Sequence, residues 1–348
     1  MIDIKNLFVD LGEFVLNDVS LNIEEGEYFI ILGPTGAGKT VLLESIAGLH
    51  PIKNGKILLR GKEVTNLEPE KRNIGIVYQD HVLFPHLSVE DNVRFGLKMH
   101  KLKKQAIVER VDWIAELLGI KHLLHRRPDT LSGGERQKVS LARALSTQPE
   151  ILLIDEPLSA LDPESREIVQ QELSRLHQTL GITILHVTHD FEEAISLGDR
   201  IAVIGEGQLK QVGTSEEIFR QPNSEFVAKF SMARNILSGT VIKKPGEDIV
   251  FRTADTEFVV VTDREGDCHA SLRPEDILIS LEPIRSSARN CYPGTITNTI
   301  NRGSTLYIEV DIPPKLSSLV TRHSFEEMEL RKGMKVFITF KAASVHIF

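Results

Sequence analysis

The sequence predicts an α/β domain followed by an all-β domain, and three observations support this division. An apolar run at 28–32 leads into the glycine-rich loop Gly33–Thr40 and then into a stretch with helical spacing, an order that recurs in α/β domains. The unbroken apolar run at 151–154 is typical of a central parallel strand, and residues 182–187 are predicted to form the next buried strand. After Pro222 the helical periodicity gives way to short β runs broken by glycine, proline and aspartate.

Composition narrows the classes of protein to consider. A chain of 348 residues, 41% of them hydrophobic, has the material for two cores. The net charge of −8 argues against a nucleic-acid partner. Cys268 and Cys291 fit no metal or redox spacing, and this usage suits a reducing cytoplasm. No apolar run approaches the ~18 residues of a membrane span, so we expect any membrane association to come through a partner.

The loop Gly33–Thr40 matches the pattern G-x-x-x-x-G-K-[ST]. Its glycines let backbone N–H groups point into one concavity, at which the next helix aims its positive end. Lys39 is placed to reach the β- and γ-phosphates of a nucleotide, and the Thr40 hydroxyl to complete the shell of Mg²⁺. A glycine-rich turn before a lysine is the alternative, which the flanking strand and helix disfavour. The predicted phosphate-binding residues are Gly33, Pro34, Thr35, Gly36, Ala37, Gly38, Lys39 and Thr40.

Polar side chains follow three of the predicted strands. Asp155 and Glu156 directly follow the apolar run 151–154, and two carboxylates at the end of a buried strand serve no packing role. Asp155 suits a Mg²⁺ contact, direct or through water, and Glu156 suits a general base that polarises the attacking water. His189, just beyond the next strand, is a candidate γ-phosphate donor, although a lone histidine is more often structural. Gln79 follows the strand at 74–78, where ligands bind in α/β sheets.

The segment Leu131–Glu135 opens a helix with a capping box of Ser132 and Glu135. Its two glycines, Gly133 and Gly134, are poor helix formers, which favours a close approach of backbone to a ligand. Asp162 caps a later helix, and that role alone accounts for it. Phe14 lies in a polar turn. It either stacks on a nucleotide base or is simply a partly buried residue of the turn.

In this order the motifs of residues 1–231 resemble those of ATP-binding cassette ATPases, among which Leu-Ser-Gly-Gly-Glu is the most specific. The resemblance implies a mixed sheet, an antiparallel β-layer and a helical subdomain, with ATP and Mg²⁺ bound between two cassettes packed head to tail. It places Ser132, Gly133 and Gly134 on the γ-phosphate of the partner's site and Glu156 as the base. It also implies that His189 contacts the γ-phosphate, and that Gln79 senses Mg²⁺ and communicates with a membrane subunit. Phe14 matches the aromatic residue that stacks on adenine, and Asp162 belongs to the same ATP-binding set.

Residues 78–80 and 84–89 resemble the import-type members of this family. Because no membrane span is present, we expect two separate transmembrane permease subunits and an extracytoplasmic substrate-binding protein. The chain would act as a homodimer, attached through its partners to the cytoplasmic face of the cell membrane.

The second half contains an internal repeat. Residues 235–241 match 290–296, and 271–279 match 338–347 more loosely. We therefore predict an OB-like domain at 232–348 with two related lobes, the second at about 286–348, chance similarity being the alternative.

The second half resembles the accessory β-barrel (TOBE) domain of import cassettes. The resemblance rests on the segment Leu272–Asp276, which recurs in such domains. The segment 286–290 resembles the molybdate-binding, Mop version, in which such a segment binds tetrahedral oxyanions between subunits. By that resemblance Ser287, Arg289 and Asn290 are the candidate oxyanion ligands, and hydroxyl, guanidinium and amide donors suit that chemistry. Sulfate is the competing anion.

These resemblances predict the ATP-hydrolysing, energy-coupling subunit of a molybdate or tungstate importer, whose C-terminal domain senses the imported anion and inhibits hydrolysis. The same role for another solute (sulfate, a sugar, a polyamine or iron) is the first alternative. A soluble phosphotransferase that uses the same phosphate loop is the second. The acidic balance and the single cassette disfavour a protein of DNA repair or translation.

Overall fold

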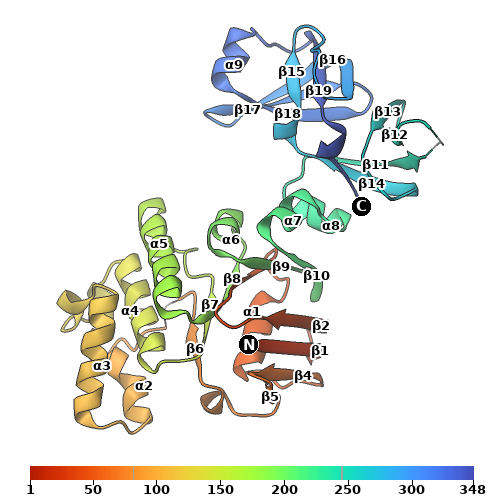
Figure 1. The fold of residues 1–348 in the computed structure, drawn as a ribbon. Coiled ribbons are helices and arrows are strands. Elements are labelled where there is room, and N and C mark those ends of the chain that lie inside the picture. Colours follow the sequence, from red (N-terminus) through yellow and green to blue (C-terminus); the bar gives the residue numbers. More distant parts are fainter. Residues whose placement is uncertain (81, 244–245) are drawn as a thin grey trace. The chain divides into compact units, whose positions relative to one another are not determined.

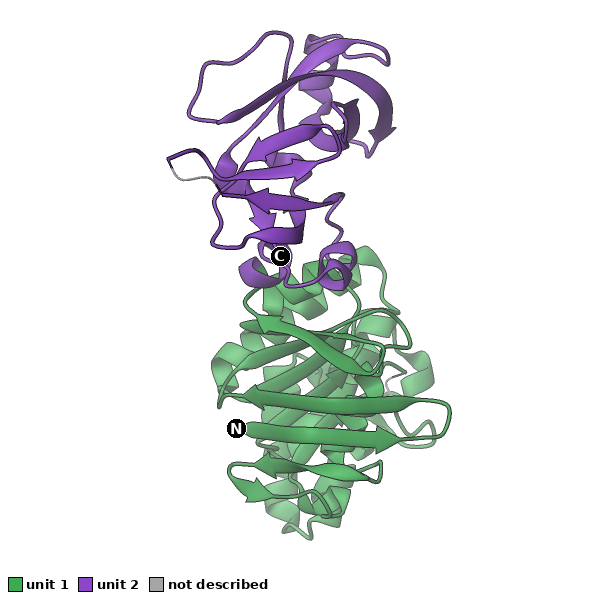
Figure 2. Cartoon of the chain, turned by 90° about the vertical axis from the view of Figure 1, so that its right-hand side faces the viewer, with its two compact units in different colours: residues 1–215 green, residues 216–348 purple. Residues whose placement is uncertain are grey.

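The computed structural model describes residues 1–80, 82–243 and 246–348 and divides into two compact units, Met1–Ser215 and Glu216–Phe348 (Figure 1; Figure 2). We call them unit 1 and unit 2. The division by compactness falls ahead of the predicted domain boundary at 231–232, which remains a prediction. In the part of the chain described, no helix combines the length and apolarity needed to cross a bilayer.

Unit 1 contains an antiparallel sheet that covers one side of its core. Along β1 the apolar residues Ile2, Ile4, Leu7 and Val9 are buried while most of their neighbours are not, as expected for a sheet with one face toward solvent. The strand order is β2-β1-β4-β5, with bounds β1 Ile2–Asp10, β2 Val15–Ile23, β4 Asn54–Leu59 and β5 Lys62–Glu63.

The second sheet of unit 1 is mixed, because β10 runs antiparallel to β9 whereas the other pairs are parallel. Every residue of β3, β7 and β8 is buried, which explains the apolar runs of β3 and β7, whereas β8 also buries the polar side chains of Thr183, His186 and Thr188. The order is β10-β9-β3-β8-β7-β6, with bounds β3 Tyr28–Leu32, β6 Ile74–Val77, β7 Ile151–Asp155, β8 Thr183–Thr188, β9 Arg200–Gly205 and β10 Gln208–Gly213. The register aligns Leu32 with Thr188 and Asp155 with Val187, so the segments that follow β3, β7 and β8 meet at one sheet edge.

Helices complete unit 1. The apolar side chains of α1, among them Leu43 and Ile46, join the core shared by the two sheets. Helices α2, α3 and α4 pack against one another, and α4 also packs against α5 (Figure 1). Their bounds are α1 Lys39–Ala47, α2 Val89–Met99, α3 Lys104–Leu117, α4 Gly133–Ser146, α5 Pro163–Leu180 and α6 Phe191–Leu197. The predicted mixed sheet, antiparallel layer and helical subdomain are confirmed.

The short helix α7 (Ser215–Arg220) begins at the last residue of unit 1. Unit 2 continues with the short helix α8 (Glu225–Phe230) and two five-stranded antiparallel sheets. One has the order β13-β12-β11-β14-β20 and the other β15-β19-β16-β17-β18. A short helix, α9 (Arg322–Glu327), follows β18. The strands are β11 Asn235–Ile242, β12 Val250–Thr253, β13 Thr256–Val259, β14 Gly266–Leu272, β15 Leu278–Ser280, β16 Asn290–Asn301, β17 Thr305–Asp311, β18 Lys315–Thr321, β19 Lys335–Phe340 and β20 Val345–Ile347.

The two sheets of unit 2 exchange strands. β15 follows β14 in sequence but pairs with β19, and β20 follows β19 but pairs with β14. Phe258 and Phe340, one from each sheet, meet edge to face at 5.3 Å in a single shared core. The predicted OB-like all-β class is confirmed, although each sheet draws strands from both predicted lobes.

The two segments of the predicted repeat begin β11 and β16 with a buried asparagine each. Asn235 donates to Ser317 O (2.9 Å) and accepts from Ser317 N (2.6 Å), on β18. Asn290 does the same with Val259 at the end of β13, with distances of 2.9 and 2.8 Å. Each amide therefore mimics a strand residue and joins one lobe to a hairpin of the other.

Candidate functional site

The phosphate loop depends on glycine at two positions. Gly36 and Gly38 have φ values of +81° and +99°, which side chains rarely adopt. A Cβ on Gly38 would also lie 2.4 Å from Cζ of Phe14. Gly38 is the N-cap residue of α1, whose first turn holds no acidic side chain, so the positive helix end faces an anion-sized site.

The Lys39 ammonium group lies inside this loop. Its Nζ donates to Gly33 O (2.9 Å) and Pro34 O (3.1 Å) and lies 3.6 Å from Oε1 of Glu156. Burial lowers the pKa of Lys39, and the carboxylate of Glu156 opposes that shift. A buried ammonium group whose hydrogen-bond partners are mostly neutral carbonyls suits an incoming phosphate. The sequence pattern of side chains does not reveal these two partners of Lys39, because both are backbone carbonyl groups.

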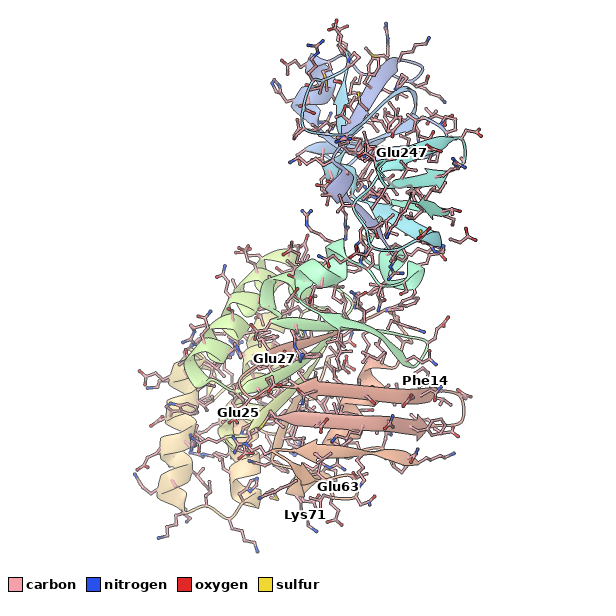
Figure 3. The ribbon with its side chains drawn as sticks, turned by 45° about the vertical axis from the view of Figure 1, so that its right-hand side comes forward. Phe14, Glu25, Glu27, Glu63, Lys71 and Glu247 are labelled. Atoms are coloured by element: carbon pink, nitrogen blue, oxygen red, sulfur yellow. The ribbon has the colours of Figure 1, made fainter. Side chains whose placement is uncertain are left out.

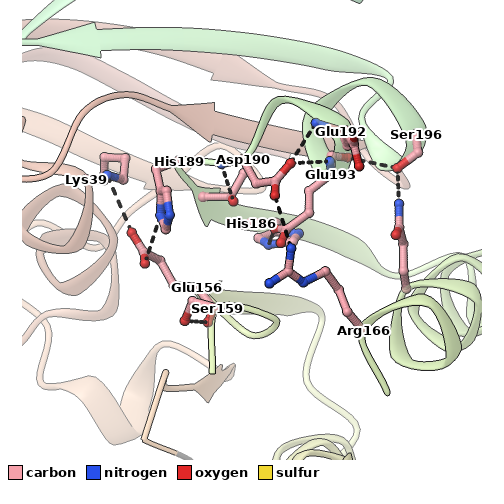
Figure 4. A network of polar contacts seen from close by, with 12 residues as sticks. Lys39, Glu156, Ser159, Arg166, His186, His189, Asp190, Glu192, Glu193 and Ser196 are labelled. Atoms are coloured by element: carbon pink, nitrogen blue, oxygen red, sulfur yellow. Dashed lines mark hydrogen bonds and ion pairs between the residues drawn. The ribbon is translucent and has the colours of Figure 1, made fainter. Parts of the chain in front are cut away.

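Glu156 bridges Lys39 and His189 (Figure 4). Its Oε2 lies 3.1 Å from Nδ1 of His189, whose side chain is 51% exposed. The backbone of Glu156 has φ of +42°, and its N–H donates to Val187 O at 2.9 Å. This left-handed turn directs the carboxylate across the end of β8 instead of along β7. A strained backbone at such a position is typical of functional sites.

The segment after His189 is anchored on both sides. Asp190 donates its N–H to Oγ1 of Thr188 (3.0 Å), and its carboxylate caps α6 by accepting from the N–H groups of Glu192 and Glu193. Nη1 of Arg166 on α5 lies 3.6 Å from the same carboxylate. These contacts fix the main chain around His189 while leaving its imidazole accessible.

Asp155 and Thr40 form a pair of oxygen donors beside Lys39. Oγ1 of Thr40 donates to Oδ2 of Asp155 at 2.9 Å, and Asp155 is only 6% exposed. Its Oδ1 is buried and has no hydrogen-bond partner among the residues described. Burial raises the pKa of Asp155, because nothing close by fully compensates its charge. A hydroxyl and an unpartnered carboxylate oxygen are ligands of the kind that Mg²⁺ takes, so these residues fit the predicted ion.

Lys39, Thr40 and Glu156 line a cavity of about 570 Å³, whereas Asp155 and His189 contact these residues without lining it. Gln79 lies exposed at its wall, and the half-buried ring of Phe14, in the turn between β1 and β2, packs over Gly38 (Figure 3). Val41 is a lining residue that sequence reasoning did not select. The cavity is lined by Phe14, Thr35, Gly36, Gly38, Lys39, Thr40, Val41, Gln79 and Glu156.

The segment Ser132–Glu135 lies outside this cavity. Ser132 N donates to Oε2 of Glu135 (2.7 Å), and Glu135 N donates to Oγ of Ser132 (3.3 Å), which completes the capping box of α4. The carboxylate of Asp162 accepts from Ser165 N at 3.0 Å and caps α5, a bond that lowers the pKa of Asp162. Within one chain, therefore, the structure does not bring these residues to the phosphate loop. Ser132, Gly134 and Glu135 line a separate hollow of about 270 Å³.

Comparisons with known proteins identify the family of this fold and site. The family described as ABC transporter matches residues 16–159, and the TOBE domain matches residues 286–347. The molybdate/tungstate import ATP-binding protein WtpC of Pyrococcus horikoshii is 41% identical over 349 residues, covering 100% of both chains. The chain belongs to the ABC transporter family. Its relatives include WtpC of Thermococcus kodakarensis (46% over 84% of this chain and 87% of that protein) and the spermidine/putrescine import ATP-binding protein PotA of Thermotoga maritima (39% over 97% and 95%).

Solved structures of ABC proteins share the fold. A component of the ABC transporter complex cbiONQ of Clostridium perfringens is 31% identical, with a TM-score of 0.59 over 63% of this chain and 90% of that one. An ATP-binding cassette solved as a dimer in a post-hydrolysis state with ADP and Pi is also 31% identical, with a TM-score of 0.56 over 62% and 99%. As an ABC ATPase, this chain binds ATP and hydrolyses it in step with transport.

The predicted oxyanion ligands of this ABC protein differ in how accessible their side chains are to an anion. Ser287 is exposed, whereas Asn290 is fully buried with its amide bonded to Val259. The guanidinium group of Arg289 pairs with the carboxylate of Asp248. Only Nη2 of Arg289 contacts Asp248, and the rest of this exposed guanidinium group is open to solvent. The oxyanion role of Ser287, Arg289 and Asn290 stays a prediction.

Proposed function

We propose that this ABC protein is the energy-coupling ATPase of an importer for molybdate or tungstate. The observation that carries the proposal is the match with the WtpC protein of Pyrococcus horikoshii, at 41% identity over 100% of both chains. The match extends over unit 2 as well as unit 1. The PotA protein of Thermotoga maritima, 39% identical over 97% of this chain, makes a polyamine importer the second candidate.

The chain's own residues supply the steps of ATP hydrolysis. Lys39 exchanges its carbonyl partners for oxygens of the β- and γ-phosphates, because an anionic acceptor binds an ammonium group more strongly. Its contact with Oε1 of Glu156 then weakens, and that oxygen is free to take a proton from the attacking water. His189, 3.1 Å from Oε2, holds the carboxylate in place and presents its other ring nitrogen toward the γ-phosphate.

Thr40, Asp155 and Gln79 are the residues that would hold Mg²⁺. The ion would supply charge neutralisation for the phosphates. The support is the buried, unpartnered Oδ1 of Asp155 beside the Thr40 hydroxyl. Gln79, at the exposed wall of the same cavity, is also placed to report nucleotide binding to a permease subunit.

We further propose that the working site needs two copies of the chain. The cavity beside the phosphate loop is open, and Ser132, Gly133 and Gly134 face a different part of the surface. A second chain packed head to tail would bring its own Ser132–Gly134 segment onto the γ-phosphate. A relative solved as a dimer with ADP and Pi supports the involvement of two copies.

The importer would also contain two transmembrane permease subunits and an extracytoplasmic substrate-binding protein. The chain would be a peripheral protein at the cytoplasmic face of the membrane. Support comes from the relatives, which are named import ATP-binding proteins.

Unit 2 would sense the imported anion. The TOBE match at 286–347 supports a regulatory role, in which bound anion holds the cassettes apart and slows hydrolysis. Measuring the ATPase rate of the assembled transporter against molybdate concentration tests this role. We expect the rate to fall as molybdate rises, and a flat response would contradict regulation.

Transport assays test the main proposal. The chain is assembled with its permease and binding protein in liposomes, and uptake of molybdate, tungstate, sulfate and spermidine is measured with and without ATP. We expect ATP-dependent uptake of the first two anions, lost when the ATPase carries Glu156→Gln. Uptake of spermidine alone would favour the second candidate. A phosphorylated organic product in place of free phosphate would indicate a phosphotransferase.

A further inference from the structure

A chain of buried polar side chains lies behind the segment that carries His189. Nε2 of His186, on β8, lies 3.4 Å from Oε2 of Glu193, on α6 (Figure 4). Nδ1 of the same ring lies 3.0 Å from the hydroxyl oxygen of Tyr28, on β3, which holds the imidazole from the other side. All three side chains are buried, and none of them lines the cavity beside the phosphate loop.

Glu193 is a charged residue at a position that favours an apolar one. Helix α6 has seven residues, too few to be stable without tertiary contacts, and its buried residues are Glu193, Ala194 and Leu197. Burial alone would raise the pKa of Glu193, but contact with His186 lowers it below its ordinary value, so the carboxyl group is ionised at neutral pH. Because an apolar residue would pack there at lower cost, the carboxylate points to a role in geometry more than in stability.

The contact between His186 and Glu193 closes a loop around His189. From His186 the main chain runs through Thr188, the last residue of β8, and past His189 to Asp190, the N-cap residue of α6. The side chain of Glu193 then returns to His186. Nε2 of His186 and Oε2 of Glu193 make no hydrogen bond to any other described residue. His189, whose side chain is 51% exposed, lies near the middle of this closed loop.

We propose that Glu193 is a positioning residue for His189, and that its contact with His186 fixes how far the His189 imidazole reaches toward the nucleotide. Thr188 and Asp190 hold the main chain on either side of His189, whereas the buried contact ties α6 to β8 and so fixes the far end of the segment. A group that acts on a phosphate must be held to within about 0.5 Å, which requires such support from behind. The inference rests on the proposed contact of His189 with the γ-phosphate.

Phosphate release by the assembled transporter at saturating ATP tests the assignment. Glu193→Ala removes the contact, whereas Glu193→Gln keeps the shape of the side chain and an oxygen that can accept from His186. Glu192→Ala removes the same charge from an exposed position of α6 and is the matched control. The second readout is the Kd of the purified chain for ADP, because ADP lacks the phosphate that His189 would contact.

We expect kcat to fall by at least about tenfold in Glu193→Ala, since a displacement of about 1 Å can cost roughly 10²-fold in rate. The Kd for ADP should stay within about twofold of the native value, because the loss is confined to the γ-phosphate. Glu193→Gln should keep most of the native rate, and Glu192→Ala all of it. A loss of ADP binding in Glu193→Ala, or a Glu193→Gln variant as slow as Glu193→Ala, would overturn the assignment.

A double variant distinguishes positioning from general damage. If Glu193 acts through His189, adding Glu193→Ala to His189→Ala should slow hydrolysis by less than about twofold more, because the positioned group is already absent. Independent effects would multiply, and a further loss of about tenfold would refute the inference. Melting temperatures identify a Glu193→Ala chain that fails to fold. Glu193→Asp then replaces it, since aspartate keeps the charge but withdraws it from His186, and an unchanged rate in that variant would also refute the inference.

Failure of this inference and failure of the proposed function are distinguishable. Normal hydrolysis in His189→Ala would remove the proposed γ-phosphate contact and the inference with it. Slow hydrolysis in His189→Ala together with normal hydrolysis in Glu193→Ala would remove the inference alone. The identity of the transported solute, which the uptake assay measures, is independent of both.

Discussion

Nδ1 of His189 lies 3.1 Å from Oε2 of Glu156, so one contact joins the segments that follow two neighbouring parallel strands. Lys39 approaches the other oxygen of the same carboxylate at 3.6 Å. Glu156 is therefore held from both sides before any nucleotide arrives, and it needs no large movement to act as a base. Such preorganisation is the structural condition for efficient proton transfer.

The first prediction concerns Glu156→Gln. The amide keeps the size and the polar contacts of the carboxylate but cannot accept a proton from water. We expect phosphate release to fall by a factor of at least about 100, because general bases contribute roughly 10²–10⁴-fold. ATP should still bind, and ATP-dependent dimers should accumulate in light-scattering measurements because they no longer turn over.

Glu109→Gln, an exposed change on α3, is the matched control and should leave both readouts unaltered. Retention of near-normal phosphate release in the Glu156 variant would exclude Glu156 as the base.

The second prediction concerns Asp155→Asn. Burial raises the pKa of Asp155 in the folded chain, so the unfolded chain ionises this group more readily. The resulting loss of folding stability is absent below the unfolded pKa, grows between the unfolded and folded values, and is complete above the folded value. At neutral pH the variant without nucleotide should therefore be more stable than the native chain. ATP hydrolysis should be lost, since the carboxylate is the proposed ion ligand.

Urea unfolding of both proteins at pH 7.5 and in acid measures this effect. The stability gained by the variant should shrink as the pH falls, because the native carboxyl group then becomes neutral as well. A variant less stable than the native chain at neutral pH would show that the Asp155 charge is compensated.

Local sequence predicts much of unit 1 because its strands carry their own signals. β3 and β7 are buried over their whole length and read as nearly continuous apolar runs, and β8, equally buried, is still mostly apolar at its centre. Polar residues just beyond such strands then have to meet at one sheet edge, which is how Glu156 and His189 can be placed near the phosphate loop.

Unit 2 is less predictable because its defining contacts are not local. β15 and β20 are three residues each, and both pair with the lobe that does not precede them in sequence. Nor does the sequence reveal that Asp248 neutralises Arg289 while Arg234 meets Tyr307.

The third prediction compares Gly38→Ala with Gly36→Ala. Both residues have positive φ, which costs an alanine about 1–2 kcal/mol. Only at Gly38 does the new methyl group also collide, 2.4 Å from Cζ of Phe14, and such overpacking adds about 1–3 kcal/mol. Gly38→Ala should therefore be the less stable variant by thermal unfolding, and it should lose ATP binding more completely. Equal losses would mean that Phe14 moves freely away from the loop.

The fourth prediction separates the two interpretations of the glycines in Leu131–Glu135. A Cβ on Gly134 would come no closer than 3.8 Å to Ser165, so packing within the chain does not require glycine. Gly134 lies in the first turn of α4, where alanine is the better helix former by up to about 1 kcal/mol. Gly134→Ala should therefore leave the isolated chain at least as stable as the native protein.

The same variant should nevertheless lose ATP-dependent dimerisation and at least nine-tenths of its hydrolysis, if this backbone approaches a nucleotide held by the partner copy. Asp112→Ala raises helix propensity at an exposed position of α3 and controls for any effect of helix stability alone. Thermal unfolding, light scattering with ATP and phosphate release together decide the matter. A Gly134→Ala chain that dimerises and hydrolyses ATP normally would leave the glycine without a role in either copy, since nothing inside the folded chain requires it.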